Sequence, residues 1–417
     1  MEKLIIEKFA GIKSLEIDLT HINVLIGPQA SGKSVSAKLI YFFKSFFLEI
    51  KKGVENEVTR REINAEHISK FINYFPKESW PDENFSIKYF IENSYFLIQS
   101  TNGKNIKFTY STDIENIIKN AKNIFKKEKE RIKNTKSIVS FELSRNFNQK
   151  FNELIKNEIL DCSTYNQIFI PAGRSFFSNV QASIFSFLSS NKSIDPFLIE
   201  FGSFYENFKR FSNDEFFINE KQKKDKDFEK IINNILNSNY TREKEKDYLM
   251  HQDKRKVNLS NASSGQQEIL PLLIILQTLT KISFSGDGAV LYIEEPEAHL
   301  SPNAQKMVVK LFARLFNSNK MKFQMIITTH SPYILSSFNN LMYAGYLSET
   351  NIENADIYKI IPQAEIIKPQ EVSAYSFTPN KEILSLIDSE THLIAQNILD
   401  EVSNEISFEF GKLMELE

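Results

Sequence analysis

The stretch INVLIGPQASGKSVSAKL, residues 22–39, decides how the rest of the chain is interpreted. Residues 22–26 are mostly apolar and rich in β-branched side chains, which predicts a short buried strand of a parallel sheet. Residues 27–34 match the pattern G-x-x-x-x-G-K-[ST] at every fixed position. A helical pattern of apolar residues follows directly. The strand–loop–helix context that this pattern requires is therefore present.

The spacing within this loop suits the binding of phosphate groups. Gly27 and Gly32 allow tight turns that point successive backbone N–H groups at an anion, and the next helix adds its positive dipole end. Lys33 is expected to reach the β- and γ-phosphates of a nucleotide, and Ser34 to bind Mg²⁺. The alternative, a glycine-rich turn that binds nothing, is disfavoured by the complete match. The residues predicted to bind the nucleotide are Gly27, Pro28, Gln29, Ala30, Ser31, Gly32, Lys33, Ser34 and Val35.

Composition limits the class of protein. The 417 residues, 25% charged and 41% hydrophobic, indicate a soluble globular protein of two or three domain-sized units, or one large domain with insertions. A net charge of −2 excludes a global basic field, though not a local patch. The single cysteine, Cys162, excludes a disulfide framework and is expected to be a small buried side chain. No signal-peptide pattern and no long apolar run is seen, so no membrane insertion and a cytoplasmic location are expected.

Apolar periodicity divides the first half of the chain into elements around the loop. Two strands are expected at 3–9 and 13–19, and the helix after the loop should run to about residue 51. Alternation over 85–110 predicts a three-stranded antiparallel meander. Residues 113–160 are helical and lysine-rich, which is typical of a solvated helix face. The alternative is a track for the phosphates of DNA.

The second half predicts an α/β fold. Strands at 166–170, 289–293 and 324–329 alternate with helical patterns at 269–282 and 302–316. Such alternation implies right-handed parallel crossovers and a doubly wound sheet, in which ligands gather at the carboxyl ends of the strands.

The remaining segments carry weaker patterns. Residues 176–240 are expected to be helical, and 240–259 to form a charged hairpin. After residue 337 the pattern predicts a weak β-like region and then a helix over about 381–416.

Two adjacent carboxylates, Glu294 and Glu295, follow the strand 289–293. Glu294 is expected to hold Mg²⁺, often through water, although aspartate is more usual at such a position. Glu295 is placed to orient the attacking water as a general base. The alternative of two exposed loop carboxylates is disfavoured, because they end a very apolar strand in a chain that already carries a phosphate loop.

Two further features can contribute to the same site. His330 ends the strand 324–329 within expected reach of the γ-phosphate, where it could donate a hydrogen bond. His299 is interpreted as a loop or interface residue. Residues 263–268, SSGQQE, precede the apolar helix and form an N-cap, although a Ser-Gly helix start is also an anion site.

The order of four phrases resembles the head of an ABC-type ATPase. These phrases are GPQASGKS at 27–34, SSGQQE at 263–268, YIEEPEAHLSP at 292–302 and TTHSP at 328–332. The wording is most similar to the soluble group of OLD proteins, SMC-like DNA-repair ATPases and anti-phage defence ATPases. The resemblance covers about residues 3–335. It implies a P-loop NTPase with a mixed parallel core sheet, an antiparallel β meander and a helical insertion.

The resemblance also implies a mechanism. ATP and Mg²⁺ would lie between the phosphate loop of one subunit and Ser264, Gly265 and Gln266 of a second in a head-to-tail homodimer. Closure and opening would control a separate effector, a nuclease or toxin, in anti-phage defence or DNA repair. One alternative is an ATP-bound scaffold that sequesters such an effector with little turnover. A transporter ATPase subunit is the other, and the EPEAHL wording weighs against it.

On this interpretation the chain has four parts. Residues 1–111 hold the first part of the head, 112–258 the lysine-rich helical insertion, 259–340 the second part of the head, and 341–417 a C-terminal β/helical cap. Relatives often carry a nuclease domain after the ATPase. The C-terminal part offers Asp388 and Asp400 but no convincing metal cluster, so no nuclease is expected in this chain.

The sequence departs from the family pattern at several points. The signature reads SSGQQ where transporters have LSGGQ, and Ala10 stands where many relatives carry arginine. No glutamine clearly matches the usual metal-contacting one; Gln99 and Gln167 are the candidates. Arg174, in the phrase IPAGRS, echoes the relatives and is interpreted as a lobe-interface or phosphate-side residue, or as part of a salt bridge.

Overall fold

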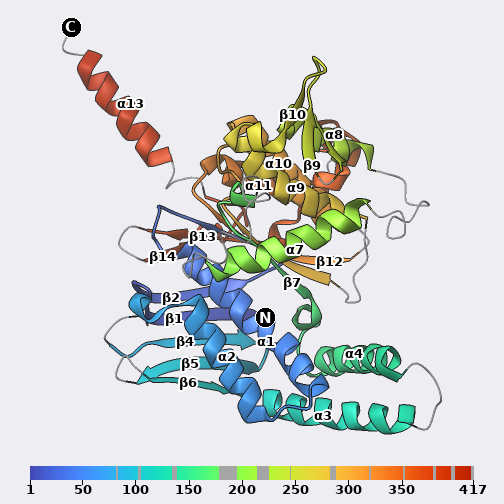
Figure 1. The fold of residues 1–417 in the computed structure, drawn as a ribbon. Coiled ribbons are helices and arrows are strands. Elements are labelled where there is room, and N and C mark those ends of the chain that lie inside the picture. Colours follow the sequence, from blue (N-terminus) through green and yellow to red (C-terminus); the bar gives the residue numbers. More distant parts are fainter. Residues whose placement is uncertain are drawn as a thin grey trace.

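The computed structural model describes residues 1–80, 83–101, 105–133, 139–177, 195–213, 225–244, 246–281, 288–318, 321–350, 353–378, 382–395 and 400–414 (Figure 1). The strands are β1 (Glu2–Phe9), β2 (Ile12–Leu19), β3 (Ile22–Ile26), β4 (Ser86–Ile91), β5 (Ser94–Thr101), β6 (Asn105–Tyr110), β7 (Asn166–Ile170), β8 (Asn239–Glu243), β9 (Lys246–Met250), β10 (Lys256–Asn258), β11 (Gly288–Glu294), β12 (Lys322–Thr329), β13 (Val372–Phe377) and β14 (Ile383–Ser385). The α-helices are α1 (Lys33–Glu55), α2 (Arg60–Tyr74), α3 (Thr112–Lys133), α4 (Val139–Glu158), α7 (Pro196–Asn213), α8 (Lys226–Leu236), α9 (Ser264–Leu279), α10 (Pro302–Phe316), α11 (Pro332–Ser348), α12 (Asn354–Ile360) and α13 (Asp400–Met414). Short 3₁₀ helices cover Lys77–Ser79, Asp161–Thr164, Leu259–Asn261, Gln363–Glu365 and Pro369–Glu371.

A central sheet with the strand order β14-β13-β3-β12-β11-β7 carries the predicted motifs. β13, β3, β12, β11 and β7 run parallel, and β14 is an antiparallel edge. Ile26 pairs with Thr329, and Glu294 with Thr328. The carboxyl ends of β3, β12 and β11 therefore share one edge, as the sequence predicts.

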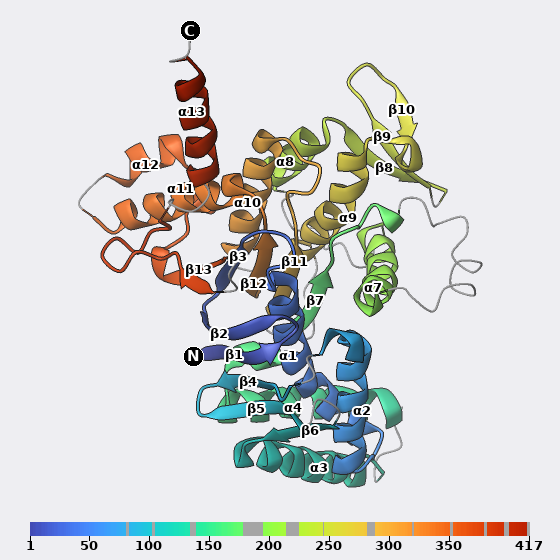
Figure 2. The same cartoon turned by 90° about the vertical axis from the view of Figure 1, so that its left-hand side faces the viewer.

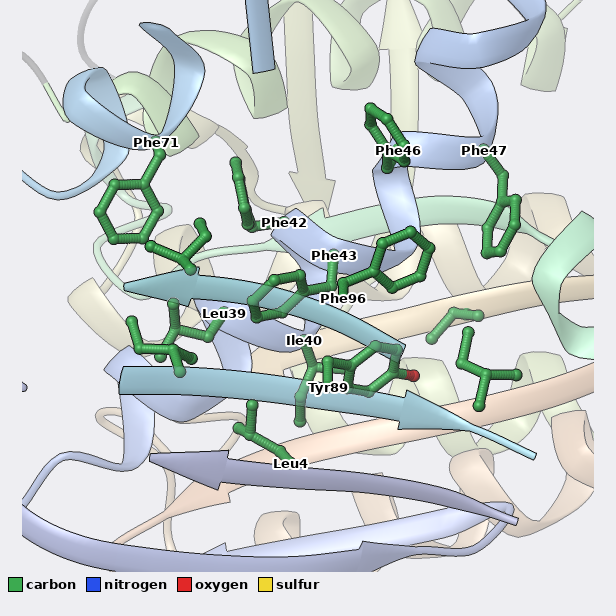
Figure 3. Close-up of a cluster of buried hydrophobic side chains, with 14 of the residues drawn as sticks. Leu4, Leu39, Ile40, Phe42, Phe43, Phe46, Phe47, Phe71, Tyr89 and Phe96 are labelled. Atoms are coloured by element: carbon green, nitrogen blue, oxygen red, sulfur yellow. The ribbon is translucent and has the colours of Figure 1, made fainter. Parts of the chain in front are cut away.

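A second sheet, with the order β2-β1-β4-β5-β6, is antiparallel throughout. β4, β5 and β6 form the meander predicted over 85–110. Helix α1 packs a row of phenylalanines on this sheet, as Figure 3 shows for Phe43, Phe46 and their neighbours. The Phe43 ring stacks on Tyr89 at 5.6 Å between centroids, and Phe46 meets Phe96 edge-on at 5.7 Å. Aromatic burial therefore fixes α1, and with it the loop that precedes it.

The two sheets are also joined by a buried polar cluster. Lys44 Nζ on α1 lies 2.7 Å from Glu2 Oε1 on β1 and donates to Gln324 Oε1 on β12 at 2.6 Å. Gln324 Nε2 donates in turn to Glu2 Oε2 at 2.6 Å. Because each buried charge has its partners, the cluster specifies how α1 is oriented between the sheets.

A second core lies on the other side of the central sheet. It is formed with helices α7, α8, α9, α10 and α11, which lie together in both Figure 1 and Figure 2. Helix α9 is apolar around almost its whole circumference and is buried from Glu268 to Leu276. Such a helix can only be stable inside the protein. Among the described helices, none is both long and apolar enough to cross a bilayer.

The C-terminal part differs from the prediction in two ways. The weak β-like region expected after residue 337 is wrong in its first part, where α11 continues to Ser348 and α12 follows, and is correct at β13. Ser331 caps α11 and Pro332 occupies its first position, which are standard start signals. The helix expected over 381–416 is wrong in its first part, where β14 pairs with β13, and α13 begins only at Asp400.

Strand β13 belongs to the central sheet rather than to a separate layer. It runs parallel to β3, with Val372 opposite Ile22 and Ser376 opposite Ile26. The segment that the sequence assigned to a C-terminal cap therefore supplies the strand beside the phosphate loop. The boundaries at 111, 258 and 340 stay predictions. Part of the helical prediction for 176–240, including most of the lysine run at 221–226, lies outside the described residues.

Candidate ATP site

The phosphate loop between β3 and α1 contains three residues with positive φ. Gly27, Ala30 and Gly32 have φ values of 152°, 58° and 106°. A Cβ on Gly27 would lie 2.3 Å from the Phe377 carbonyl oxygen at the end of β13, and one on Gly32 would lie 2.8 Å from the Ile12 side chain. Both glycines are required by close packing as well as by φ. The backbone therefore turns tightly at both glycines, as a phosphate-binding loop requires.

Lys33 begins α1 and is buried, with 4% of its surface exposed. Its Nζ donates to the carbonyl oxygens of Gly27 at 2.9 Å and Pro28 at 2.7 Å. Burial lowers the pKa of Lys33 to about 8, although Glu295 and Glu297 act to raise it. A charge held over the loop with few water contacts is well placed to meet phosphate.

Glu294 ends β11 beside the start of α1. Its Oε2 accepts a hydrogen bond from the Ala172 backbone N–H at 3.3 Å. Burial raises the pKa of Glu294, while Lys38, Ala172 and the hydroxyl of Ser34 act in the opposite direction. Ser34 and Glu294, both predicted to hold Mg²⁺, therefore lie close together.

The donor set around Glu294 fits a divalent cation. Glu294 Oε1 and Thr328 Oγ1 are buried without a hydrogen-bond partner among the described residues. Within the same residues, no group of three or more His, Cys, Asp or Glu side chains could hold a metal by itself. Mg²⁺ commonly takes one or two carboxylates plus phosphate and water oxygens, which is the set available here.

Glu295 and His330 meet at the carboxyl ends of β11 and β12. His330 Nε2 lies 3.2 Å from Glu295 Oε1, and the Glu295 side chain is 37% exposed. Glu295 has a left-handed φ of 44°, and its N–H donates to the Thr328 carbonyl at 2.9 Å. Such backbone strain persists only where surrounding contacts enforce it, as at functional sites.

Glu297 is a residue that the sequence analysis missed. Its Oε1 accepts a hydrogen bond from the His330 backbone N–H at 2.6 Å, and its Oε2 is buried without a partner among the described residues. Glu297 therefore fixes the backbone that carries His330. The only signal in the sequence was that a third acidic residue follows Glu294 and Glu295. Its contact with His330 could not be predicted locally, because it depends on the pairing of β11 with β12.

The predicted signature begins helix α9. Ser263 caps the helix, and the Gln266 side chain completes a capping box with it. Gln266 Nε2 also donates to the Leu236 carbonyl at 2.7 Å, so this side chain is engaged within its own chain. Ser264 is exposed. Across the described ranges, no hydrogen bond joins Ser264, Gly265 or Gln266 to the phosphate loop.

Gly265 faces the turn that follows Glu295. A Cβ on Gly265 would lie 2.6 Å from the His299 carbonyl oxygen. His299 itself is exposed, has a φ of 60° and lies in a turn, so it is a loop residue as predicted, and its interface role stays a prediction. The signature is therefore in close contact with the turn after Glu295 in the same chain.

The other candidates of the sequence analysis lie elsewhere. Gln167 pairs with Val290 on the sheet, well before the carboxyl edge, and accepts from the Tyr292 hydroxyl at 2.7 Å. Gln99 lies on β5 of the antiparallel sheet. The structure therefore gives no support to either glutamine as the metal contact. Burial raises the pKa of Cys162 to about 12, in accord with a partly buried, unreactive thiol.

Arg174 follows β7 and is completely buried. Its Nη2 lies 3.3 Å from Glu268 Oε1 on α9, and its Nη1 donates to the Glu294 carbonyl at 2.7 Å. The salt-bridge interpretation is therefore confirmed, and the lobe-interface interpretation stays a prediction. Because the Arg174 side chain is completely buried, it is not available to contact phosphate.

A glycine-rich phosphate loop, a strand-end carboxylate pair and a histidine on the next strand define an α/β P-loop ATPase. The chain belongs to the AAA ATPase domain family, whose model matches residues 1–335. The site described above is accordingly an ATP site.

Similar proteins were found by sequence and by structure. The endonuclease GajA of Bacillus cereus (strain HuB5-5) is 27% identical over 158 residues, which are 33% of this chain and 21% of that protein. This chain thus matches about a fifth of that relative's length.

Among solved structures, an SMC head bound to the C-winged helix domain of ScpA has a TM-score of 0.38 at 12% identity, covering 80% of this chain and 90% of that one. The SMC head domain from Thermotoga maritima has a TM-score of 0.34 at 12% identity with the same coverage. Such low scores add nothing to the fold described above.

Proposed function

We propose that this chain is an ABC-type ATPase whose hydrolytic site is completed by a second copy. The observation that carries this proposal is the division of the site. Lys33, Ser34 and the Glu294–Glu295 pair converge at one sheet edge. Ser264 is exposed at a helix start that makes no hydrogen bond to that loop within the described residues. An exposed helix N-terminus that does not contact the phosphate loop of its own chain is suited to the γ-phosphate of a neighbour.

Each residue at the sheet edge has a distinct role in this proposal. The loop N–H groups and Lys33 hold the β- and γ-phosphates, and Ser34 with Glu294 holds Mg²⁺. Bound Mg²⁺ would supply charge neutralisation for the phosphates. Glu295 orients the attacking water and accepts its proton. His330, oriented by Glu295 and Glu297, donates a hydrogen bond toward the γ-phosphate.

The output of the ATPase is proposed to lie in a partner. Closure of two copies on ATP and opening after hydrolysis would control a separate nuclease or toxin in anti-phage defence or DNA repair. The similarity to an endonuclease that is matched over about a fifth of its length supports this setting. DNA binding along α3 and α4 remains part of the proposal. Several of their basic residues are already paired, among them Lys129 with Glu57 and Lys150 with Glu128.

ATP turnover by the parent, Lys33→Ala and Glu295→Gln tests the site. Loss of a general base lowers kcat by about 10²–10⁴-fold, so Glu295→Gln should bind ATP and scarcely hydrolyse it. Lys33→Ala should lose binding. The matched controls are Lys119→Ala and Glu66→Gln, whose side chains are exposed on α3 and α2. Parental turnover in both site variants contradicts the assignment. Robust Mg²⁺- or Mn²⁺-dependent DNA cleavage by the isolated chain contradicts the separate nuclease.

A further inference from the structure

Arg174 joins three parts of the molecule that are far apart in sequence. Its guanidinium is completely buried, and Nε donates to the Glu268 carbonyl at 2.9 Å. Nη1 donates to the carbonyls of Pro171 at 3.0 Å and Glu294 at 2.7 Å, and Nη2 to the carbonyl of Glu295 at 3.1 Å. One planar cation therefore holds β7, the first turns of α9 and the backbone of both site carboxylates.

Glu268 closes this link from the side of the signature helix. It lies one turn after Ser264 and is 2% exposed. Its Oε1 accepts from the Arg174 backbone N–H at 2.9 Å and its Oε2 from the Ser175 backbone N–H at 2.9 Å. Burial alone would raise the pKa of Glu268, but the Arg174 charge and these N–H groups hold it below its ordinary value. The carboxylate is thus a fixed anchor for Arg174.

We propose that Arg174 is a positioning residue that transmits the position of the signature helix to Glu295 of the same chain. This inference rests on the ATP site shared between two copies. Arg174 does not touch ATP in the proposal. Its guanidinium donates hydrogen bonds to the Glu294 and Glu295 carbonyls, and Glu268 fixes the guanidinium from the side of α9. Arg174 therefore acts through these two carbonyls.

Physical chemistry favours this role over a purely stabilising one. A buried ion pair contributes little net stability, because the desolvation of both charges offsets their attraction. The guanidinium instead fixes the relative positions of the groups that it contacts, since its donors have fixed directions that a lysine ammonium cannot reproduce. Glu295 sits in a left-handed conformation that needs enforcement. The Gly265–His299 contact provides a second connection between the same two segments.

The link has a consequence for a head-to-tail pair. The signature of one copy would grip ATP held by its partner, while Glu295 of that copy acts on ATP held by its own loop. Arg174 therefore connects the two ATP sites through one chain. Occupation of one site should favour the working position of Glu295 in the other, which is positive cooperativity in ATP.

The test is steady-state ATP turnover by the full chain over a range of ATP concentrations. Arg174→Lys keeps the buried charge but loses the fork. Arg174→Met combined with Glu268→Gln removes both charges together, so that no unpaired charge is left inside. Arg314→Lys is the matched control, because the Arg314 side chain is only 8% exposed and also pairs with a carboxylate on another element, with Nε 2.9 Å from Glu365 Oε1.

The Arg174 variants are expected to lose turnover and cooperativity but to keep ATP binding. Both Arg174 variants should keep ATP affinity within a few-fold, lower kcat by roughly 10- to 100-fold, and reduce the Hill coefficient from above 1 to about 1. Arg314→Lys should keep the parental values. Melting curves give the folded fraction of each variant.

Two results would overturn the inference. The first is that the Arg174 variants keep the parental Hill coefficient and the parental kcat per folded molecule. Arg174 would then have a structural role only, even if the variants melt at lower temperatures. The other is a parent that shows no cooperativity. If instead Glu295→Gln hydrolyses ATP like the parent, it is the proposed function that fails.

Discussion

Replacement of Gly265 by alanine separates helix propensity from tertiary contact. In an ordinary helix, Gly→Ala stabilises by about 1 kcal/mol. Here the new Cβ would lie 2.6 Å from the His299 carbonyl oxygen, whereas ordinary van der Waals contact begins at 3.4 Å. The helix start and the turn after Glu295 must therefore separate by about 0.8 Å, the difference between these distances. Such overpacking costs about 1–3 kcal/mol, so a net loss of about 1 kcal/mol is expected.

Two measurements check this expectation. Melting without ATP should show a lower transition temperature for Gly265→Ala than for the parent. Since a shift of about 1 Å near reacting groups can cost about 100-fold, kcat should fall by roughly that factor. Gly411→Ala is the control, because that glycine lies in α13 with no atom within 4 Å of the added Cβ. It should keep parental turnover. A Gly265→Ala variant that melts above the parent and hydrolyses ATP normally would refute the contact.

Two other predictions concern named side chains. Although burial alone would raise it, the charges and hydrogen bonds of His67 and Lys70 lower the pKa of Glu49 from 4.5 to about 2. A carboxyl with a depressed native pKa stabilises the fold above its unfolded pKa and loses that contribution as pH falls toward the native one. The unfolding free energies of the parent and Glu49→Gln should therefore differ by more at pH 5 than at pH 3; a difference that does not change over this range contradicts the assignment. Glu297→Ala leaves the His330 N–H without its acceptor and should lower kcat about tenfold, whereas Glu297→Gln keeps an oxygen there and should stay near the parent. Equal turnover in the two variants would remove Glu297 from the site.

Local sequence patterns were sufficient for the parts of the site that are local. The loop at 27–34 is defined by its own spacing, and β11 and β12 by continuous apolar runs. Because parallel strands share their direction, the convergence of Glu294, Glu295 and His330 followed from the strand order alone.

The parts that sequence reasoning missed depend on contacts between distant segments. β13 pairs with β3, which lies more than 300 residues earlier in the chain, and the residues of β13 alone do not indicate which strand it pairs with. The roles of Glu297 and Glu268 depend on which strand and helix they face. The error at α11 has a different cause, because Ser331 and Pro332 are a local helix start signal from which this helix could have been predicted.

The central claim is that each ATP site is shared by two copies, and one mixing experiment tests it most directly. Lys33→Ala disables the phosphate loop, and Ser264→Arg blocks the signature. Each variant alone should be inactive. In a mixture, half of the pairs carry one intact site, formed from the loop of one variant and the signature of the other. ATP turnover in an equimolar mixture should therefore recover to at most about a quarter of the parental rate. If the mixture stays as inactive as its components while the two variants are shown to associate, or if Ser264→Arg alone retains parental turnover, the shared site is contradicted.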